Sequence, residues 1–167
     1  MSQPLNITII GAGLGGLAVA RALREQHNVT VVERWEGRNE VGAAINLGPT
    51  AVEWLNKMGF NPERTGSIEA TIARTYARDG RFLGETDMTK FLKNTKGKWY
   101  LQHRADLFNE FLHLSTAPSK ELGVSGEPVK VRWATDAVGV DVDSGDVTLR
   151  GGEVIKSDLV VGKMLCD

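Results

Sequence analysis

The sequence predicts an α/β fold in which a parallel sheet is combined with an antiparallel β-meander. Three features predict it: a strand, glycine turn, helix and strand at the start, an alternating stretch over residues 137–155, and a buried strand over residues 158–162. Strands separated by a helical segment pair in parallel, whereas strands joined by short turns pair antiparallel. We expect the chain to form one compact unit.

The first unit opens with an apolar run over residues 5–10, which suits a strand buried on both faces. A glycine cluster over residues 11–16 follows, and then a helical pattern from Leu14 to about Gln26. The apolar residues that can share one stripe of this helix are Leu14, Leu17, Ala18, Ala22 and Leu23. A β-branched strand over residues 29–33 completes a Rossmann-like βαβ unit, whose crossover should be right-handed.

The later elements are shorter. Residues 34–48 are expected to form a loop, followed by a helix over residues 49–58. The segments 71–77 and 81–85 flank Arg78-Asp79-Gly80, which indicates a hairpin. A helix over residues 104–114 and a strand over residues 129–133 precede the meander, in which valines alternate with polar residues and glycines.

Composition excludes several classes of protein. The chain has 20 basic and 21 acidic residues, which argues against an extended basic surface for nucleic acid. No apolar run approaches the roughly 20 residues that span a bilayer, and the first residues lack the layout of a signal peptide. We therefore expect a cytoplasmic protein. No metal-ligand spacing occurs, and we assign no catalytic residue.

Gly11, Gly13 and Gly16 match the pattern G-x-G-x-x-G between a strand and a helix. The first glycine permits a tight turn, the second lets the backbone approach a pyrophosphate, and the third lets the helix pack close to the strand. Glu33 ends the second strand about 20 residues onward, where a carboxylate binds the adenosine ribose and repels a 2′-phosphate. The pattern predicts a site for FAD or NAD and does not choose between them.

The downstream sequence favours FAD, because a loop, a hairpin and a meander replace the further strand–helix crossovers of a typical NAD dehydrogenase. From residue 7 to residue 162 the sequence resembles the aromatic-ring hydroxylases among FAD-dependent monooxygenases, the salicylate-hydroxylase-like branch in particular. The segments that carry the resemblance are residues 11–16, Glu33, the run from Glu40 to Pro49, the run from His103 to Leu107, and residues 158–162.

The resemblance implies that Glu33 binds the FAD ribose, that Ala43 and Ala44 lie along the cofactor, and that Arg104 reaches it from the start of a helix. It also implies NAD(P)H- and O₂-dependent hydroxylation of a small, usually aromatic molecule. Family members often have an arginine directly before the Glu-Val-Gly run. Here that position is Asn39, with Arg38 one residue earlier, and neither is assigned the role.

The resemblance ends at Gly162, where the family continues into Gly-Ala-Asp-Gly and this sequence reads Gly-Lys-Met-Leu-Cys-Asp. We therefore expect residues 1–162 to be the N-terminal part of an FAD-binding domain, residues 163–167 to be an aberrant tail, and the substrate domain to be missing. Such a chain should bind FAD weakly and not turn over alone. The alternatives are a noncatalytic dinucleotide-binding module, with a completing polypeptide unknown, and an NAD-dependent dehydrogenase fragment.

Overall fold

The computed structural model describes residues 3–37, 43–92 and 96–162. Contacts divide the chain into two compact units. Unit 1 comprises Met1–Glu40 and Phe111–Asp167, and unit 2 comprises Val41–Glu110. The expected boundary of a single FAD-binding domain at residue 162 stays a prediction, and residues 163–167 lie outside the described residues.

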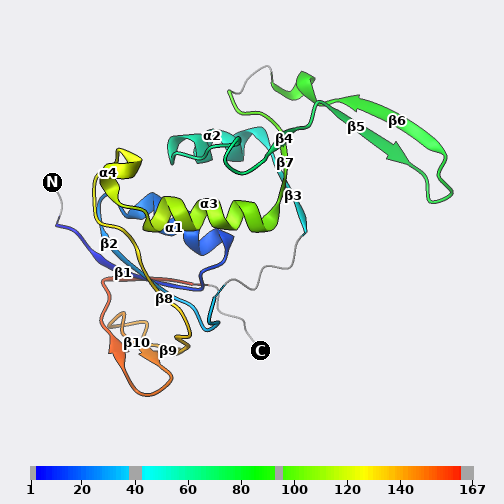
Figure 1. The fold of residues 1–167 in the computed structure, drawn as a ribbon. Coiled ribbons are helices and arrows are strands. Elements are labelled where there is room, and N and C mark those ends of the chain that lie inside the picture. The colour runs from blue at the N-terminus through cyan, green and yellow to red at the C-terminus, as the bar shows by residue number, and fades with distance from the viewer. Residues whose placement is uncertain (1–2, 38–42, 93–95, 163–167) are drawn as a thin grey trace. The chain divides into compact units, whose positions relative to one another are not determined.

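Unit 1 is built on a four-stranded parallel sheet with the order β12-β1-β2-β8 (Figure 1). Its strands are β1 (Asn6–Ile10), β2 (Asn28–Val32), β8 (Lys130–Arg132) and β12 (Leu159–Gly162). Helix α1 (Leu14–Leu23) connects β1 to β2. The predicted βαβ unit and the strand before Gly162 are thus confirmed.

The side chains of β1 and β2 alternate between two faces of the sheet. On one face Ile7, Ile9, Val29 and Val31 are buried, together with Leu17 of α1. The second half of α3 (Arg104–Thr116) also contacts α1, because Ser115 Oγ donates a hydrogen bond of 3.0 Å to the carbonyl of Leu17. Helices therefore close this face.

The meander covers part of the opposite face. It consists of β9 (Ala137–Val140), β10 (Val147–Leu149) and β11 (Val154–Ile155), which pair antiparallel. Val147 and Leu149 form a buried cluster with Val32, the last residue of β2. Figure 1 shows the meander on the side of the sheet away from α1. The expected combination of a parallel sheet and a meander is confirmed.

A buried arginine ties the end of α1 to the end of α3. Arg24 is fully buried, and its guanidinium donates to the carbonyls of Leu114 at 3.0 Å, Ser115 at 2.8 Å and Ala117 at 3.0 Å. The last carbonyls of a helix have no helical partner, so a cation is favourable there. Burial lowers the pKa of Arg24, and the neighbouring charge of Arg21 lowers it further.

Unit 2 contains a three-stranded antiparallel sheet with the order β3-β7-β4. Its elements are β3 (Ala44–Leu47), α2 (Pro49–Lys57), β4 (Ile68–Glu69), β5 (Ile72–Tyr76), β6 (Phe82–Asp87), the 3-10 helix η1 (Met88–Leu92), β7 (Tyr100–His103) and the first half of α3. Buried Glu110 accepts two hydrogen bonds from the guanidinium of Arg64, each 2.6 Å long.

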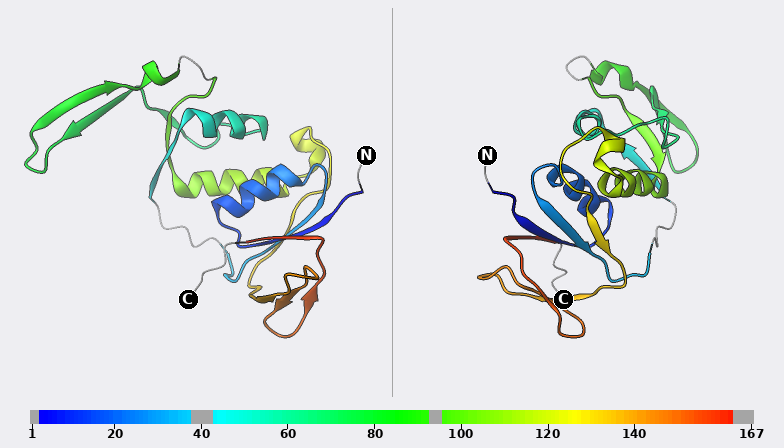
Figure 2. Two further views of the ribbon diagram at one scale, coloured as in Figure 1. Left: turned by 180° about the vertical axis from the view of Figure 1, so that it is seen from behind. Right: turned by 60° about the vertical axis from the view of Figure 1, so that its left-hand side comes forward.

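Strands β5 and β6 form the predicted hairpin, which extends from the rest of unit 2 in both views of Figure 2. Every side chain of β5 is exposed, including Ile72 and Tyr76. The ring of Tyr76 meets that of Phe82 edge to face, with 5.6 Å between centroids. The hairpin is thus held mainly by its own ladder and cross-strand pairs.

The expectation of a loop over residues 34–48 is wrong at its end, where β3 lies. Strands β4 and β7 and the short helix α4 (Ser119–Leu122) were also not predicted from the sequence. Strand β3 exists because β7, more than fifty residues later, pairs with it, a contact that no local pattern reveals. Among the residues that the structure describes, no helix is long and apolar enough to cross a membrane.

Candidate functional site

The glycine turn joins β1 to α1 in unit 1. Gly11 has φ of +102°, and its N–H donates to the carbonyl of Val32 at 2.8 Å. A Cβ at Gly16 would lie 2.0 Å from the carbonyl oxygen of Gly11, so only glycine permits this approach of helix to turn. A Cβ at Gly13 would meet nothing within 4 Å. The turn and the close packing expected of Gly11 and Gly16 are present, whereas their contact with a cofactor stays a prediction.

The start of α1 is open to an acceptor. Gly13 occupies the N-cap position, no side chain caps the helix, and the first turn contains no acidic residue. The first amides of a helix lack helical acceptors and carry a partial positive charge. An anion such as a pyrophosphate could therefore accept these hydrogen bonds.

Glu33 lies directly after β2 and is half-buried. Its Oε2 accepts the N–H of Ala12 at 2.8 Å, and its Oε1 accepts the N–H of Trp35 at 3.1 Å. Two backbone donors thus fix the carboxylate, which is not freely solvated. Each carboxylate oxygen can accept more than one hydrogen bond, so capacity remains for ligand hydroxyls.

A cavity of about 400 Å³ opens beside Glu33. We call it the carboxyl-end pocket, and its lining residues are 10–11, 32–35 and 135–137. It lies beyond the carboxyl ends of β1 and β2, where ligands bind in open α/β sheets. The turn that begins after β8 closes one side, because Thr135 N–H donates to the carbonyl of Glu33 at 2.7 Å.

Trp35 also lines this pocket and is 53% exposed. Trp35 belongs to none of the sequence motifs that predict the site. Trp54 is 62% exposed as well, so packing does not explain either side chain. The available signal was the position of Trp35, two residues beyond Glu33.

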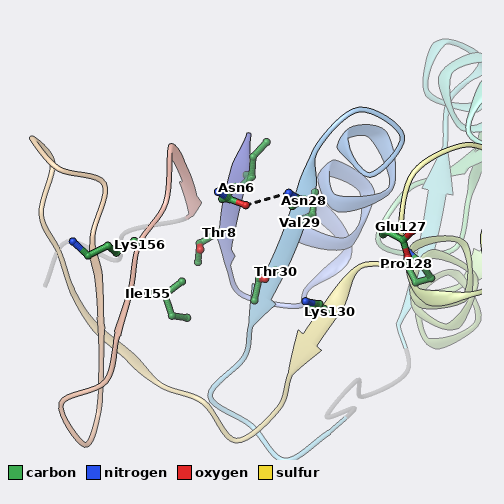
Figure 3. Close-up of a pocket in the computed structure, with 11 residues that line it drawn as sticks. Asn6, Thr8, Asn28, Val29, Thr30, Glu127, Pro128, Lys130, Ile155 and Lys156 are labelled. Carbon is green, nitrogen blue, oxygen red and sulfur yellow. Dashed lines mark hydrogen bonds between the residues drawn. The ribbon is translucent and has the colours of Figure 1, made fainter. Parts of the chain in front are cut away.

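A larger cavity of about 470 Å³ lies at the other end of the sheet (Figure 3). We call it the amino-end pocket, and its polar lining residues are Asn6, Thr8, Asn28, Thr30, Glu127, Lys130 and Lys156. Asn28 and Asn6 bond to each other, with 3.2 Å between Nδ2 and Oδ1. The glycine turn and Glu33 lie at the opposite end of the strands. The amino-end pocket is larger, but the glycine turn and Glu33 make the smaller carboxyl-end pocket the better candidate.

Unit 2 brings together the other three residues expected at the cofactor. Ala44 pairs with His103 across the β3–β7 ladder, and the N–H of Arg104 donates to the carbonyl of Ala43 at 2.9 Å. Arg104 begins α3, as predicted, and its side chain is exposed. Arg38, Asn39 and the start of the run at Glu40 lie outside the described residues. Within the described parts of the chain no group of three or more His, Cys, Asp or Glu residues could hold a metal.

The fold is Rossmann-like, and residues 9–46 match the family of NAD(P)-binding Rossmann-like domains. Among solved structures, 2-methyl-3-hydroxypyridine-5-carboxylic acid oxygenase matches 94% of this chain with a TM-score of 0.73 and 23% identity, over 38% of its own chain. PqsL of P. aeruginosa matches 93% of this chain with a TM-score of 0.74 and 22% identity, over 41% of its own.

The relatives found by sequence are named as monooxygenases or hydroxylases, and several of them as FAD-dependent. Hispidin-3-hydroxylase of Neonothopanus nambi is 31% identical over 95% of this chain and 37% of that protein. The 3-amino-4-hydroxybenzoate 2-monooxygenase of Streptomyces cremeus is 31% identical over 97% of this chain and 40% of that protein. The expected resemblance to FAD-dependent aromatic hydroxylases is confirmed, and the chain spans little more than a third of the length of these relatives.

Proposed function

We propose that unit 1 binds the adenosine and pyrophosphate portions of FAD. One observation carries the proposal: the carboxylate of Glu33 is oriented by the amides of Ala12 and Trp35 at the edge of the carboxyl-end pocket. A carboxylate held in this way accepts hydrogen bonds from vicinal ribose hydroxyls and repels a 2′-phosphate.

The neighbouring residues fit the rest of this portion of the cofactor. The open space at Gly13 admits a phosphate close to the main chain, and the first amides of α1 donate to it. The Gly16 contact holds α1 against the turn, so these amides keep their direction. Binding therefore requires little rearrangement of the chain.

We also propose that Ala43, Ala44 and Arg104 of unit 2 contact FAD. A guanidinium supplies a fixed fork of donors and stays charged, which suits phosphate and flavin oxygens. The small side chains of Ala43 and Ala44 leave the main chain accessible, and both alanines are exposed. The hydrogen bond from Arg104 to Ala43 keeps the three residues together.

For the whole protein we propose NAD(P)H- and O₂-dependent hydroxylation of a small aromatic molecule. The names of the relatives support it, including a 3-amino-4-hydroxybenzoate 2-monooxygenase and a 3-hydroxybenzoate 6-hydroxylase. When bound, the flavin supplies the redox chemistry, and the protein orients and shields it. The cytoplasmic location, the nicotinamide donor and any completing polypeptide belong to the same proposal.

The test is a titration of the purified chain with FAD and, separately, with NAD, followed by flavin fluorescence and by calorimetry. We expect both ligands to bind through the ADP portion that they share and FAD to bind more tightly, because only FAD carries the flavin that Arg104 is proposed to contact. Glu33→Ala should raise the Kd for FAD about 10-fold or more, because it removes charge-assisted hydrogen bonds to the ribose. Glu36→Ala is the matched control, since Glu36 is an exposed acid nearby that does not line the pocket.

Each outcome separates the candidate functions. Tight binding of NAD without FAD would support a dehydrogenase fragment, and binding of neither would refute the proposal. Binding of FAD without activity fits the expectation for this chain alone. Stoichiometric flavin after purification, with NAD(P)H oxidation that depends on an aromatic substrate, would contradict the expected weak binding and lack of turnover.

A further inference from the structure

The carboxyl-end pocket contains an aromatic side chain that the ribose and phosphate contacts leave unused. Trp35 lines this pocket with its indole 53% exposed. A single exposed apolar residue needs no explanation by itself. Trp35 differs because its exposed surface belongs to a pocket that also contains the carboxylate proposed to hold a ribose.

The main chain of Trp35 is fixed on both sides. Its N–H donates to Glu33 Oε1 at 3.1 Å, and its carbonyl accepts the N–H of Ala134 at 2.9 Å. Thr135 N–H also donates to the carbonyl of Glu33 at 2.7 Å. The indole and the carboxylate are therefore attached to one short, braced segment, so the distance between their attachment points varies little.

The chemistry of the ring suits a nucleobase. The guanidinium of Arg34 lies 5.1 Å from the centroid of the Trp35 ring, which adds a planar cation to the aromatic surface. Indole and guanidinium planes both stack on bases, and base–aromatic stacking tolerates any base because each has a π-face. The base of a nucleoside is bonded directly to its ribose. Trp35 is two residues from Glu33, the residue proposed to bind the ribose, so its ring can reach the base.

We propose that Trp35 stacks on the adenine of the bound cofactor and is the main side chain that positions this end of it. The inference rests on the proposed function, in which Glu33 holds the ribose of FAD. It predicts that affinity for any ligand with an adenosine depends on the aromatic ring at position 35.

The experiment compares the Kd for FAD and for ADP between the wild-type chain and three variants. Trp35→Leu should raise both Kd values about 10-fold, because it keeps an apolar side chain but removes the stacking surface. Trp35→Phe should stay within about 3-fold of the wild type, because a ring remains. Thermal melting of each variant checks that the chain is folded.

Trp54→Leu is the matched control. Trp54 is an equally exposed tryptophan with a cation over its ring, since Lys57 Nζ lies 4.2 Å from the centroid, but it belongs to α2 in unit 2. This substitution should leave both Kd values unchanged. ADP should also quench tryptophan emission in the Trp54→Leu protein but not in the Trp35→Leu protein.

The outcomes distinguish the two proposals. If the wild type binds neither FAD nor ADP, the proposed function itself fails. If the wild type binds both and Trp35→Leu binds equally well, the role of Trp35 is refuted while that of Glu33 stands. If Trp35→Leu does not fold, an ADP titration of the Trp35→Phe protein still decides, because this variant keeps a ring at position 35 while Trp54, Trp99 and Trp133 remain. Its affinity should be kept and the quenching lost, and quenching equal to that of the wild type would refute stacking on Trp35.

Discussion

The two ends of the parallel sheet in unit 1 carry cavities of similar size but different chemistry. At the carboxyl ends the turn residue Gly11 and the braced carboxylate of Glu33 line a cavity of about 400 Å³. At the amino ends, asparagine, threonine and lysine side chains line a cavity of about 470 Å³. The difference teaches that cavity volume alone is a poor criterion for a site, and it makes the carboxyl end, with its backbone donors fixed in direction, the better candidate.

The two ends of β2 differ in polarity on the face that the meander partly covers. Val32 stands at the end of β2 under the meander cluster, whereas Asn28 and Thr30 occupy the same face nearer its beginning. The covered part of the face is apolar and the open part is polar. The amino-end pocket is thus explained as a solvated sheet face.

The strongest test of the carboxyl end is Gly16→Ala. The new methyl group would lie 2.0 Å from the carbonyl oxygen of Gly11, so the helix or the turn must shift. We expect a loss of about 3 kcal/mol in the free energy of unfolding, as in other overpacked sites. Urea denaturation followed by circular dichroism measures it. Gly15→Ala is the control, because its Cβ meets nothing within 4 Å, and equal losses in both variants would contradict the packing role.

Gly13→Ala should affect binding more than folding. The residue has φ of −72° and open space around its Cβ position, so alanine fits the conformation at a cost of about 0.5 kcal/mol at an N-cap. A methyl group there obstructs the approach of a pyrophosphate, and we expect the Kd for FAD to rise at least about 10-fold. Calorimetric titration of this variant beside Gly15→Ala measures the difference. An unchanged Kd would remove Gly13 from the site.

A smaller effect is expected at the turn that begins after β8. Ala134 has φ of +50°, a left-handed conformation that is unfavourable for alanine by about 1–2 kcal/mol. Ala134→Gly relieves this strain but increases the entropy of the unfolded chain, which leaves a net gain of about 0.5 kcal/mol. The melting temperature should rise by about 1–2 °C. Ala73→Gly, in strand β5, should lower it, and a decrease in both variants would argue against relieved strain.

The amino end should show the smallest effect. Lys130 is exposed in the larger pocket, so Lys130→Ala removes a charge from that cavity without touching the turn or Glu33. We expect stability to change by less than about 0.5 kcal/mol and the Kd for FAD to stay within about 2-fold. Parallel titrations with the wild type measure both. A large loss of affinity would reverse the comparison between the two ends.

The sequence was sufficient for the parts of the fold whose pattern is local. The βαβ unit, the hairpin around Gly80 and the meander each show a hydrophobic pattern over a few residues together with a glycine-containing turn. The structure has each of them. Strand β3 depends on pairing with β7, and the region that contains it looked like a loop. The predicted stripe of α1 was correct at Leu17 and wrong at Ala22, which is exposed. Arg21 and Arg24 are buried instead, because distant carbonyls and Glu25 satisfy them.

The glycine turn and Glu33 of the candidate site could be predicted from the sequence, whereas the other side chains that line its pocket could not. Gly11, Gly13, Gly16 and Glu33 follow from a spacing that the glycine turn itself imposes. The roles of Ala43, Ala44 and Arg104 came only from resemblance, yet the structure places these three residues together. The position of Trp35 two residues beyond Glu33 was the only signal for it, because the pocket that it lines is completed by residues 135–137, a hundred residues later.

The carboxylate of Glu33 bridges Ala12 and Trp35 and so links the glycine turn to the segment that carries the indole. Groups that share such a bridge are energetically coupled, so substitutions on its two sides should not have additive effects. A double-mutant cycle that combines Gly13→Ala with Trp35→Leu would therefore report a coupling free energy for FAD binding. The phosphate-binding turn and the adenine-binding ring would then act cooperatively. The intact nucleotide would bind with a more favourable free energy than the separate contributions of its phosphate and adenine portions add up to.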